Sequence, residues 1–322
     1  MSTRGSSNLR KLLSPGDMDT LWYYKIGFAI WWFVNAVTVI ILSQVKFKSD
    51  ADGDGDGDSG TDGCTWLSTT LDVTSDYRTG GGEGAGGKDP ASAGIQFWGL
   101  PEVGAVGPVN LGLLLGVGLA LEFLWLVVQL FFHEREMYAV ANDHNPFRWW
   151  RYGWSHGIFW LAVAITAGVP NVYVLTLLTA MVVIWLFFFS VNEAFNSVSV
   201  NSARVKSGGR AGWMWYDAFV AAILVFIVTA VIVFIHLGFA ASNTAFDVDG
   251  AQLATAAYVT PIAAAVIYLA LPVIIYLHHS GAALQTVSDK ERAMYWFQFV
   301  FLTVVTWLSL AIYTAVDCTI EA

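Results

Sequence analysis

Charged side chains are scarce in this sequence. Asp, Glu, Lys and Arg make up only 13% of the 322 residues, whereas soluble globular domains hold about a quarter. Hydrophobic residues account for 56% of the chain and aromatic residues for 15%. This composition excludes an ordinary soluble domain and predicts an integral membrane protein that crosses the lipid bilayer several times.

The sequence also lacks a complete hydrolase site. HEREM, at residues 133–137, begins like the HExxH helix of zinc proteases, but Met137 stands where the second histidine ligand is needed. GWSHG, at residues 153–157, has the spacing of a GxSxG motif, but it falls inside a long apolar run and not at the turn between a strand and a helix that such a motif requires. The two cysteines form no cluster with histidine. We therefore expect no enzymatic activity, no catalytic residues and no zinc site of the protease type.

What the sequence does hold is a series of long apolar runs. The hydrocarbon core of a bilayer requires about 20 mostly apolar residues in each helical span, and seven runs approach or exceed that length. The predicted fold class is therefore an all-α bundle of seven transmembrane helices. The predicted spans cover residues 21–42, 109–132, 149–167, 172–191, 216–238, 254–277 and 294–315.

The positions of Lys and Arg predict how the bundle is oriented, because basic residues in short loops stay on the cytoplasmic side. They occur before the first span and in the connections that follow the second, fourth and sixth spans. The connections after the third and fifth spans and the C-terminus have none. We expect a cytoplasmic N-terminal tail (1–20), a transmembrane domain (21–316) and an outer C-terminal tail (317–322).

One long hydrophilic segment, residues 44–107, is expected to lie on the outer side after the first span. Its acidic tract, SDADGDGDGDSGTDG, contributes much of the net charge of -9. Asp52, Asp54 and Asp56 alternate like the ligands of a calcium loop, but the glutamate required at the twelfth position is absent. Weak calcium binding by these aspartates and a solvated acidic spacer both stay open, and no other metal site is predicted.

Cysteine occurs only twice, at Cys64 in the long loop and at Cys318 near the C-terminus. The predicted orientation places both on the outer side, where thiols can oxidise. They form either a disulfide or two separate thiols, and the sequence leaves both alternatives open. The stretch CTWLSTTLDVTSDY, residues 64–77, is rich in Thr and aromatic residues and predicts a short strand or hairpin.

Few ionisable side chains fall inside the predicted spans, where each is costly unless it is paired or faces water. Glu122 lies in the second span, and Arg151 and His156 lie in the third. From their depths along the two helices, Glu122 is able to pair with either Arg151 or His156. Such a pair is either a structural ion pair or part of a proton or ion relay.

Three segments stand out as candidate helix signatures, namely NPFRWWRYGWSHGIFW (145–160), SVNEAFN (190–196) and ERAMYWFQFVFLTVVTW (291–307). They resemble the third, fourth and seventh helix signatures of the heliorhodopsins, a family of retinal proteins with seven helices. The resemblance extends over most of the transmembrane region. It implies a seven-helix bundle with a cytoplasmic N-terminus, as the basic residues predict independently, and it implies a homodimer.

Two positions depart from the family pattern. In family members the seventh helix carries the lysine that forms the retinal Schiff base, and the matching position here is Leu302. The position of the counterion glutamate in the third helix is held by Arg151. Without a lysine amine no imine forms, so the resemblance implies a bundle that has lost covalent retinal. Glu193 matches a glutamate of the family, which implies a contact with Arg148 at the cytoplasmic end.

The sequence thus predicts a heliorhodopsin-like membrane protein that acts without light, by binding an apolar ligand or a protein partner. One alternative is a photoreceptor or antenna that holds retinal or a carotenoid without a covalent bond. Another is passive proton or ion conduction through Glu122, Arg151 and His156. Besides the bilayer, the expected partners are a second copy of the chain and an unidentified membrane or cytoplasmic protein, and nucleic acid is not expected.

Overall fold

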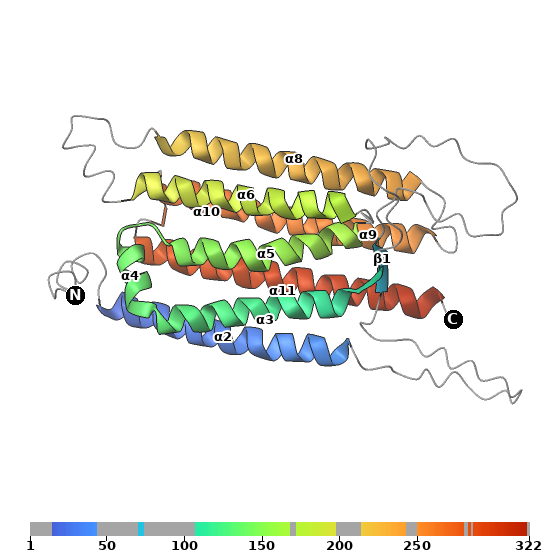
Figure 1. The fold of residues 1–322 in the computed structure, drawn as a ribbon, viewed down its shortest axis with the longest axis horizontal. Coiled ribbons are helices and arrows are strands. Elements are labelled where there is room, and N and C mark those ends of the chain that lie inside the picture. The colour runs from blue at the N-terminus through green and yellow to red at the C-terminus, as the bar shows by residue number, and fades with distance from the viewer. Residues whose placement is uncertain are drawn as a thin grey trace, which may run out of the picture.

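The computed structural model describes residues 15–43, 70–73, 107–167, 172–197, 214–242, 250–279, 283–284 and 286–320. Its long helices lie side by side with their axes nearly parallel (Figure 1). They are α2 (Pro15–Leu42), α3 (Leu111–Phe131), α5 (Pro146–Thr166), α6 (Val172–Asn196), α8 (Met214–Ser242), α9 (Gly250–Tyr268), α10 (Ala270–His279) and α11 (Val287–Ile320). The short helix α4 (His133–Ala141) lies at one end of the bundle, here called the α4 end (Figure 1).

Within the described residues, five helical stretches are long and apolar enough to cross a membrane, and one of them joins the second half of α9 to α10. They cover Gly16–Leu42, Leu111–Phe131, Val172–Asn196, Val259–His279 and Val287–Ala311. By length and composition, the chain is therefore a multi-pass membrane protein. Within the described residues α8 offers the shorter apolar stretch Phe219–Ile232, and the first half of α5 carries two arginines and a histidine. Helices lie over most of each range predicted from hydropathy, while the number of crossings and their orientation stay predictions.

Several helices extend beyond the predicted spans. α2 begins at Pro15, inside the predicted tail 1–20, and α11 continues to Ile320, inside the predicted tail 317–322. Proline is favoured in the first turn of a helix, where its missing N–H is not needed, and Asp17 suits the positive helix end. Hydropathy alone marks the apolar middle of a helix and underestimates its polar ends.

The helix predicted over residues 254–277 is interrupted at Leu269, which separates α9 from α10. Pro272 lies four residues after Tyr268, so it donates no hydrogen bond to the Tyr268 carbonyl and its ring crowds that group. The interruption therefore falls where proline chemistry requires it. It leaves the side chain of Tyr268 fully buried at the end of α9.

Glycines allow α3 to pack closely against its neighbours. A Cβ atom on Gly116 would lie 2.5 Å from the side chain of Ile40 on α2, and one on Gly118 would lie 2.7 Å from the ring of Phe159 on α5. Small residues at such points let helix backbones approach each other. Glu122 follows Gly118 by one helical turn and so lies on the same face, towards α5.

Two short strands lie at the end of the bundle opposite α4 (Figure 1). β1 (Thr70–Val73) pairs antiparallel with β2 (Gly107–Asn110), and Thr70 lies opposite Asn110. β1 falls within the stretch 64–77, so the predicted strand is confirmed. Asn110 also caps α3, because its side-chain oxygen accepts a hydrogen bond from the Leu113 N–H at 2.8 Å.

The predicted disulfide and calcium site are not tested by this fold. Cys64 and the aspartates Asp52, Asp54 and Asp56 lie outside the described residues, as does the side chain of Cys318. Both predictions therefore stay open.

Candidate functional site

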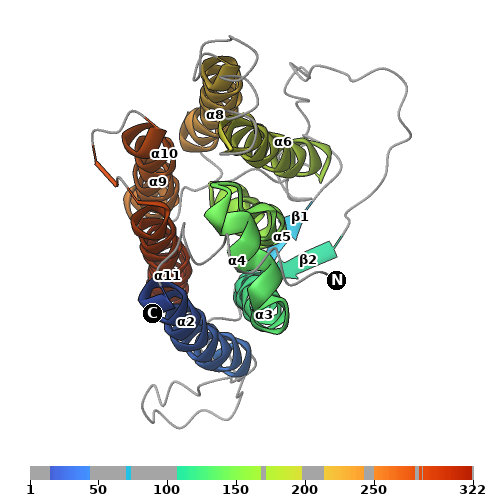
Figure 2. The ribbon, with the colours of Figure 1, turned by 90° about the vertical axis from the view of Figure 1, so that its left-hand side faces the viewer.

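The centre of the candidate site is the guanidinium group of Arg151. α5 lies between α3 and α6 and also contacts α9 and α11, which Figure 2 shows along the bundle axis. This position makes Arg151 almost fully buried, with 1% of its surface exposed. A buried charge is costly unless it is paired and its remaining hydrogens are bonded.

Polar partners on α3 and α11 surround the guanidinium group. Nε of Arg151 lies 3.1 Å from Oε1 of Glu122 in a buried ion pair. The two terminal nitrogens donate hydrogen bonds to the side-chain oxygens of Gln129, at 2.8 Å, and Gln298, at 2.7 Å. The Tyr295 ring lies beneath the guanidinium group, 5.0 Å from its centroid. The predicted pairing of Glu122 with Arg151 is confirmed.

The alternative pairing of Glu122 with His156 is wrong, because His156 has a different neighbour. Its Nδ1 atom forms a hydrogen bond with the hydroxyl group of Tyr268. Its ring stacks on Tyr152, with 4.4 Å between the centroids and 15° between the planes. His156 follows Arg151 by five residues on α5, and the rings of Tyr152, Tyr268 and Phe301 pack around it.

Leu302, at the position that the resemblance matches to the retinal lysine, is fully buried in α11. Gln298 precedes it by one turn on the same helix face and binds Arg151. Aromatic rings pack at this level with centroids 4.5–6.4 Å apart. They belong to Trp160, Trp185, Phe226, Tyr268 and Phe301. Leu302 and Arg151 are therefore close in the fold, although 150 residues separate them in the sequence.

A second group of buried charges lies at the α4 end. Arg148 makes ion pairs with both Glu193 on α6 and Glu291 on α11. Glu193 also accepts a hydrogen bond from the indole nitrogen of Trp149 at 2.7 Å. The contact between Arg148 and Glu193, which the resemblance implies, is present.

Further residues extend this group, and together they form what we call the α4-end charge cluster. Lys25 on α2 pairs with Glu136 on α4. The Asn145 amide donates hydrogen bonds to Glu136 at 3.1 Å and to Glu291 at 3.2 Å. Lys290 pairs with Asp143 and, at 3.2 Å, with Glu193. The cluster thus ties α2, α4, α5, α6 and α11 together.

Sequence reasoning found only two charged members of this cluster. Of the others, Lys25 lies within α2, whereas Glu136, Asp143, Lys290 and Glu291 lie near helix ends or in a turn. Charged residues at such positions are ordinarily solvated, so a hydropathy pattern gives no reason to bury them. A usable signal was their common location, since all lie near the predicted cytoplasmic ends of spans.

The cluster carries more negative than positive charge. Its three bases are Lys25, Arg148 and Lys290, and its four carboxylates are Glu136, Asp143, Glu193 and Glu291. Burial alone would raise the pKa of Asp143, but the Lys290 ammonium beside it holds that pKa well below its usual range. Asp143 is therefore an anion at neutral pH, and one negative charge is left over in the cluster.

His133, in the first turn of α4, makes the stability of the fold depend on pH. Burial and the nearby Lys25 ammonium, whose nitrogen lies 3.1 Å from Nδ1, lower the pKa of His133 from 6.5 to about 4. Between about pH 6.5 and pH 4, the unfolded chain binds a proton at this residue and the folded chain does not. Stability is therefore complete above this window and falls as the pH decreases through it.

The measurement is the thermal unfolding midpoint of the detergent-solubilised protein on both sides of that window. We expect His133→Gln to reduce the loss of stability at low pH, because glutamine accepts the Lys25 hydrogen bond but does not titrate. Equal losses in the variant and the unmodified protein would contradict this assignment.

The fold and these contacts define a helical membrane bundle with two buried groups of charges. No protein-family model matches the chain, and a search of curated proteins finds no match. The resemblance to the heliorhodopsins therefore rests on the segments and positions described above.

Proposed function

We propose that this chain is a heliorhodopsin-like protein with seven spans and a cytoplasmic N-terminus that acts without covalently bound retinal. Its function is to bind an apolar ligand or a partner protein in a light-independent way. The observation that carries the proposal is Arg151, which binds Gln298 one helical turn before Leu302 and has its own counterion in Glu122.

The charges near Leu302 support the proposal that the lysine that binds retinal has been lost. A protonated Schiff base is a cation and needs a nearby carboxylate, because a lone charge is costly inside a bundle. Arg151 already supplies the cation here, and Glu122 on α3 balances it. A second cation beside Leu302 would be repelled by the guanidinium group.

The same contacts give conduction little support. Glu122 and Arg151 neutralise each other, and the side chains of Gln129 and Gln298 accept hydrogen bonds from the two terminal nitrogens of the guanidinium group. His156 bonds to Tyr268 and does not continue the chain of polar groups. A relay requires groups that exchange protons in sequence, whereas this arrangement is suited to holding helices together.

α11 is the helix through which a binding event would affect both groups of buried charges. It contacts Arg151 through Gln298 and the α4-end charge cluster through Lys290 and Glu291. A ligand or partner that favours a different position of α11 would act on both groups of charges. Such a difference in affinity between two arrangements is what a binding event needs in order to shift a conformational equilibrium.

The test is the absorption spectrum of protein purified from cells supplied with all-trans retinal. We expect no visible band in the unmodified protein and a band that borohydride traps in the variant Leu302→Lys, Arg151→Glu, Glu122→Gln. The third change is needed because Arg151→Glu alone would place two carboxylates side by side. Leu302→Lys with Arg151 retained is the matched control, and we expect it to stay colourless.

Two results would contradict the proposal. A borohydride-trapped adduct in the unmodified protein would mean that retinal is bound covalently at another amine. A visible band that solvent extracts without chemical cleavage would support the photoreceptor or antenna alternative.

A further inference from the structure

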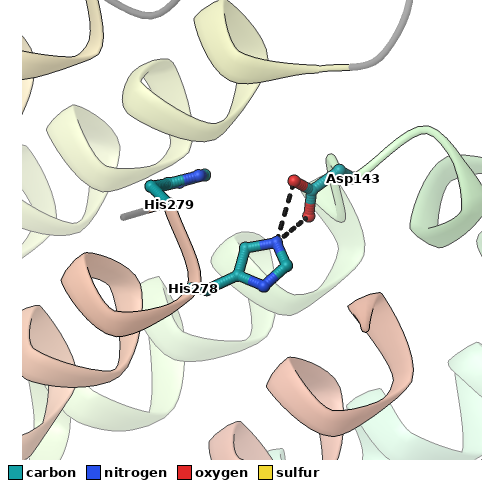
Figure 3. A group of neighbouring side chains, drawn as sticks. All are labelled: Asp143, His278 and His279. Carbon is teal, nitrogen blue, oxygen red and sulfur yellow. Dashed lines mark hydrogen bonds and ion pairs between the residues drawn. The ribbon is translucent and has the colours of Figure 1, made fainter. Parts of the chain in front are cut away.

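Three side chains that the proposed function does not use meet at the α4 end. Asp143 lies in the turn between α4 and α5, and His278 and His279 are the last two residues of α10. One ligand atom from each lies within 4.8 Å of the others. Figure 3 shows the imidazole of His278 facing the Asp143 carboxylate, and that of His279 extending towards it from the neighbouring backbone position.

The hydrogen bonds of His278 show which ring nitrogen carries a hydrogen and which one presents a lone pair to the Asp143 carboxylate. Nδ1 lies 2.6 Å from the carbonyl oxygen of Leu284, which only accepts hydrogen bonds, so Nδ1 carries the hydrogen. Nε2 lies 3.0 Å from Oδ2 and 3.1 Å from Oδ1 of Asp143. In neutral histidine, Nε2 and the carboxylate are both acceptors, and a cation is required between them.

This arrangement has the form that metal-binding histidines take. Such a histidine usually donates its second N–H to a backbone carbonyl or a carboxylate, which orients the ring, as Leu284 does for His278. Lys290 pairs with Oδ1 of Asp143, so Oδ2 is directed to His278. The excess negative charge of the α4-end charge cluster also favours a cation at this point.

We propose that Asp143, His278 and His279 bind a divalent transition-metal ion of the zinc type. Two imidazole nitrogens and one carboxylate oxygen suit zinc and its neighbours, whereas calcium and magnesium prefer oxygen ligands alone. Ligand atoms on one tetrahedral zinc ion lie roughly 3.3 Å apart, given zinc–ligand distances of about 2.0–2.2 Å. The pair formed by His278 and Asp143 is already near that spacing, and a small movement of His279 completes the site.

A proton on His278 would also balance the charge, but it would engage only two of the three residues. A metal ion engages all three and ties the turn between α4 and α5 to the end of α10. The site does not depend on whether the bundle binds a chromophore, a ligand or neither.

The experiment uses the full chain in detergent, purified with a tag that contains no histidine and stripped of metal with a chelator. Zinc binding is measured by isothermal titration calorimetry in the unmodified protein and in His279→Ala. The control is His144→Ala, which removes a neighbouring histidine that does not belong to the group. We expect one zinc ion per chain and at least a roughly tenfold weaker affinity in His279→Ala, the scale seen when metal sites lose a supporting group. His144→Ala should bind zinc as the unmodified protein does.

Failure of the unmodified protein to bind zinc in a one-to-one ratio would overturn the proposal, because a proton alone would then occupy the site. Equal zinc affinities in His279→Ala and the unmodified protein would also overturn it. If His279→Ala aggregates, His279→Gln keeps the size and polarity of the side chain while removing the imidazole ligand, and the same comparison applies.

Discussion

Replacing Arg148 with methionine will destabilise the folded protein by about 3–5 kcal/mol, the cost of leaving buried charges without their partner. Arg148 is the sole base that pairs with both Glu193 and Glu291 among the described contacts. Methionine keeps much of the length of the side chain and removes its charge, so the loss reports electrostatics more than packing. The measurement is the free energy of unfolding in mild detergent, obtained from a denaturant titration.

A double variant separates the contributions that the two carboxylates, Glu193 and Glu291, make to this loss of stability. Arg148→Met combined with Glu291→Gln removes one of the stranded carboxylates, while Glu193 keeps its contact with Lys290. We expect the double variant to recover part of the lost stability, so the two changes are not additive. Arg148→Lys should cost less than Arg148→Met because it keeps the charge but loses the two-sided geometry of the guanidinium group. A loss of less than about 1 kcal/mol in Arg148→Met, the scale of an exposed pair, would contradict the buried cluster.

Replacing Glu122 with leucine will have an effect of similar size, about 3–5 kcal/mol, because the Arg151 guanidinium group is then buried without a counterion. The double variant Glu122→Leu, Arg151→Met removes both charges. Its stability should return close to that of the unmodified protein, because replacing a whole buried ion pair by apolar side chains is often neutral or stabilising. The coupling energy from this double-mutant cycle measures the ion pair directly.

The same position distinguishes a structural pair from a conduction path. Glu122→Gln keeps an oxygen that accepts hydrogen bonds but removes the negative charge, so we expect an intermediate loss of stability. Proton flux into liposomes that contain the protein should not differ between Glu122→Gln and the unmodified chain. A flux that depends on Glu122 would contradict the structural role and favour the relay. If the double variant is as unstable as Glu122→Leu alone, Arg151 stabilises the bundle through its amide contacts and not through Glu122.

Together, these results would show whether the two groups of charges act as structural ties or as functional elements. The Arg151 group joins α3, α5 and α11, and the α4-end charge cluster joins helices at the end of the bundle. In lipid, helices gain little from burying apolar surface, so packing and polar contacts between helices carry more of the association energy. The buried ion pairs of Lys290 and Glu291 at one level, and the hydrogen bond between Gln298 and Arg151 at the other, therefore contribute to the choice of neighbours for α11.

The sequence by itself determined the class of protein and the positions of the helices. Long apolar runs leave a helix as the structure that satisfies the backbone in lipid, and helices lie over the ranges predicted from them. The strand within residues 64–77 followed from local composition. Glu122 was recognised as needing a partner because a charge inside a span is costly, and its distance along α3 made Arg151 one of two candidates.

The tertiary structure alone decided which candidate was correct and which helix ends meet. His156 and Arg151 lie at similar depths along α5. Because α5 packs against α9, His156 forms a hydrogen bond with Tyr268, and Glu122 pairs with Arg151. Lys290 and Asp143 are far apart in sequence, and each would be solvated if its helix end stood alone. The group formed by Asp143, His278 and His279 has no fixed sequence spacing, because its members come from two ends of different helices. Hydropathy describes each segment in isolation, whereas these contacts depend on how the segments are arranged around one another.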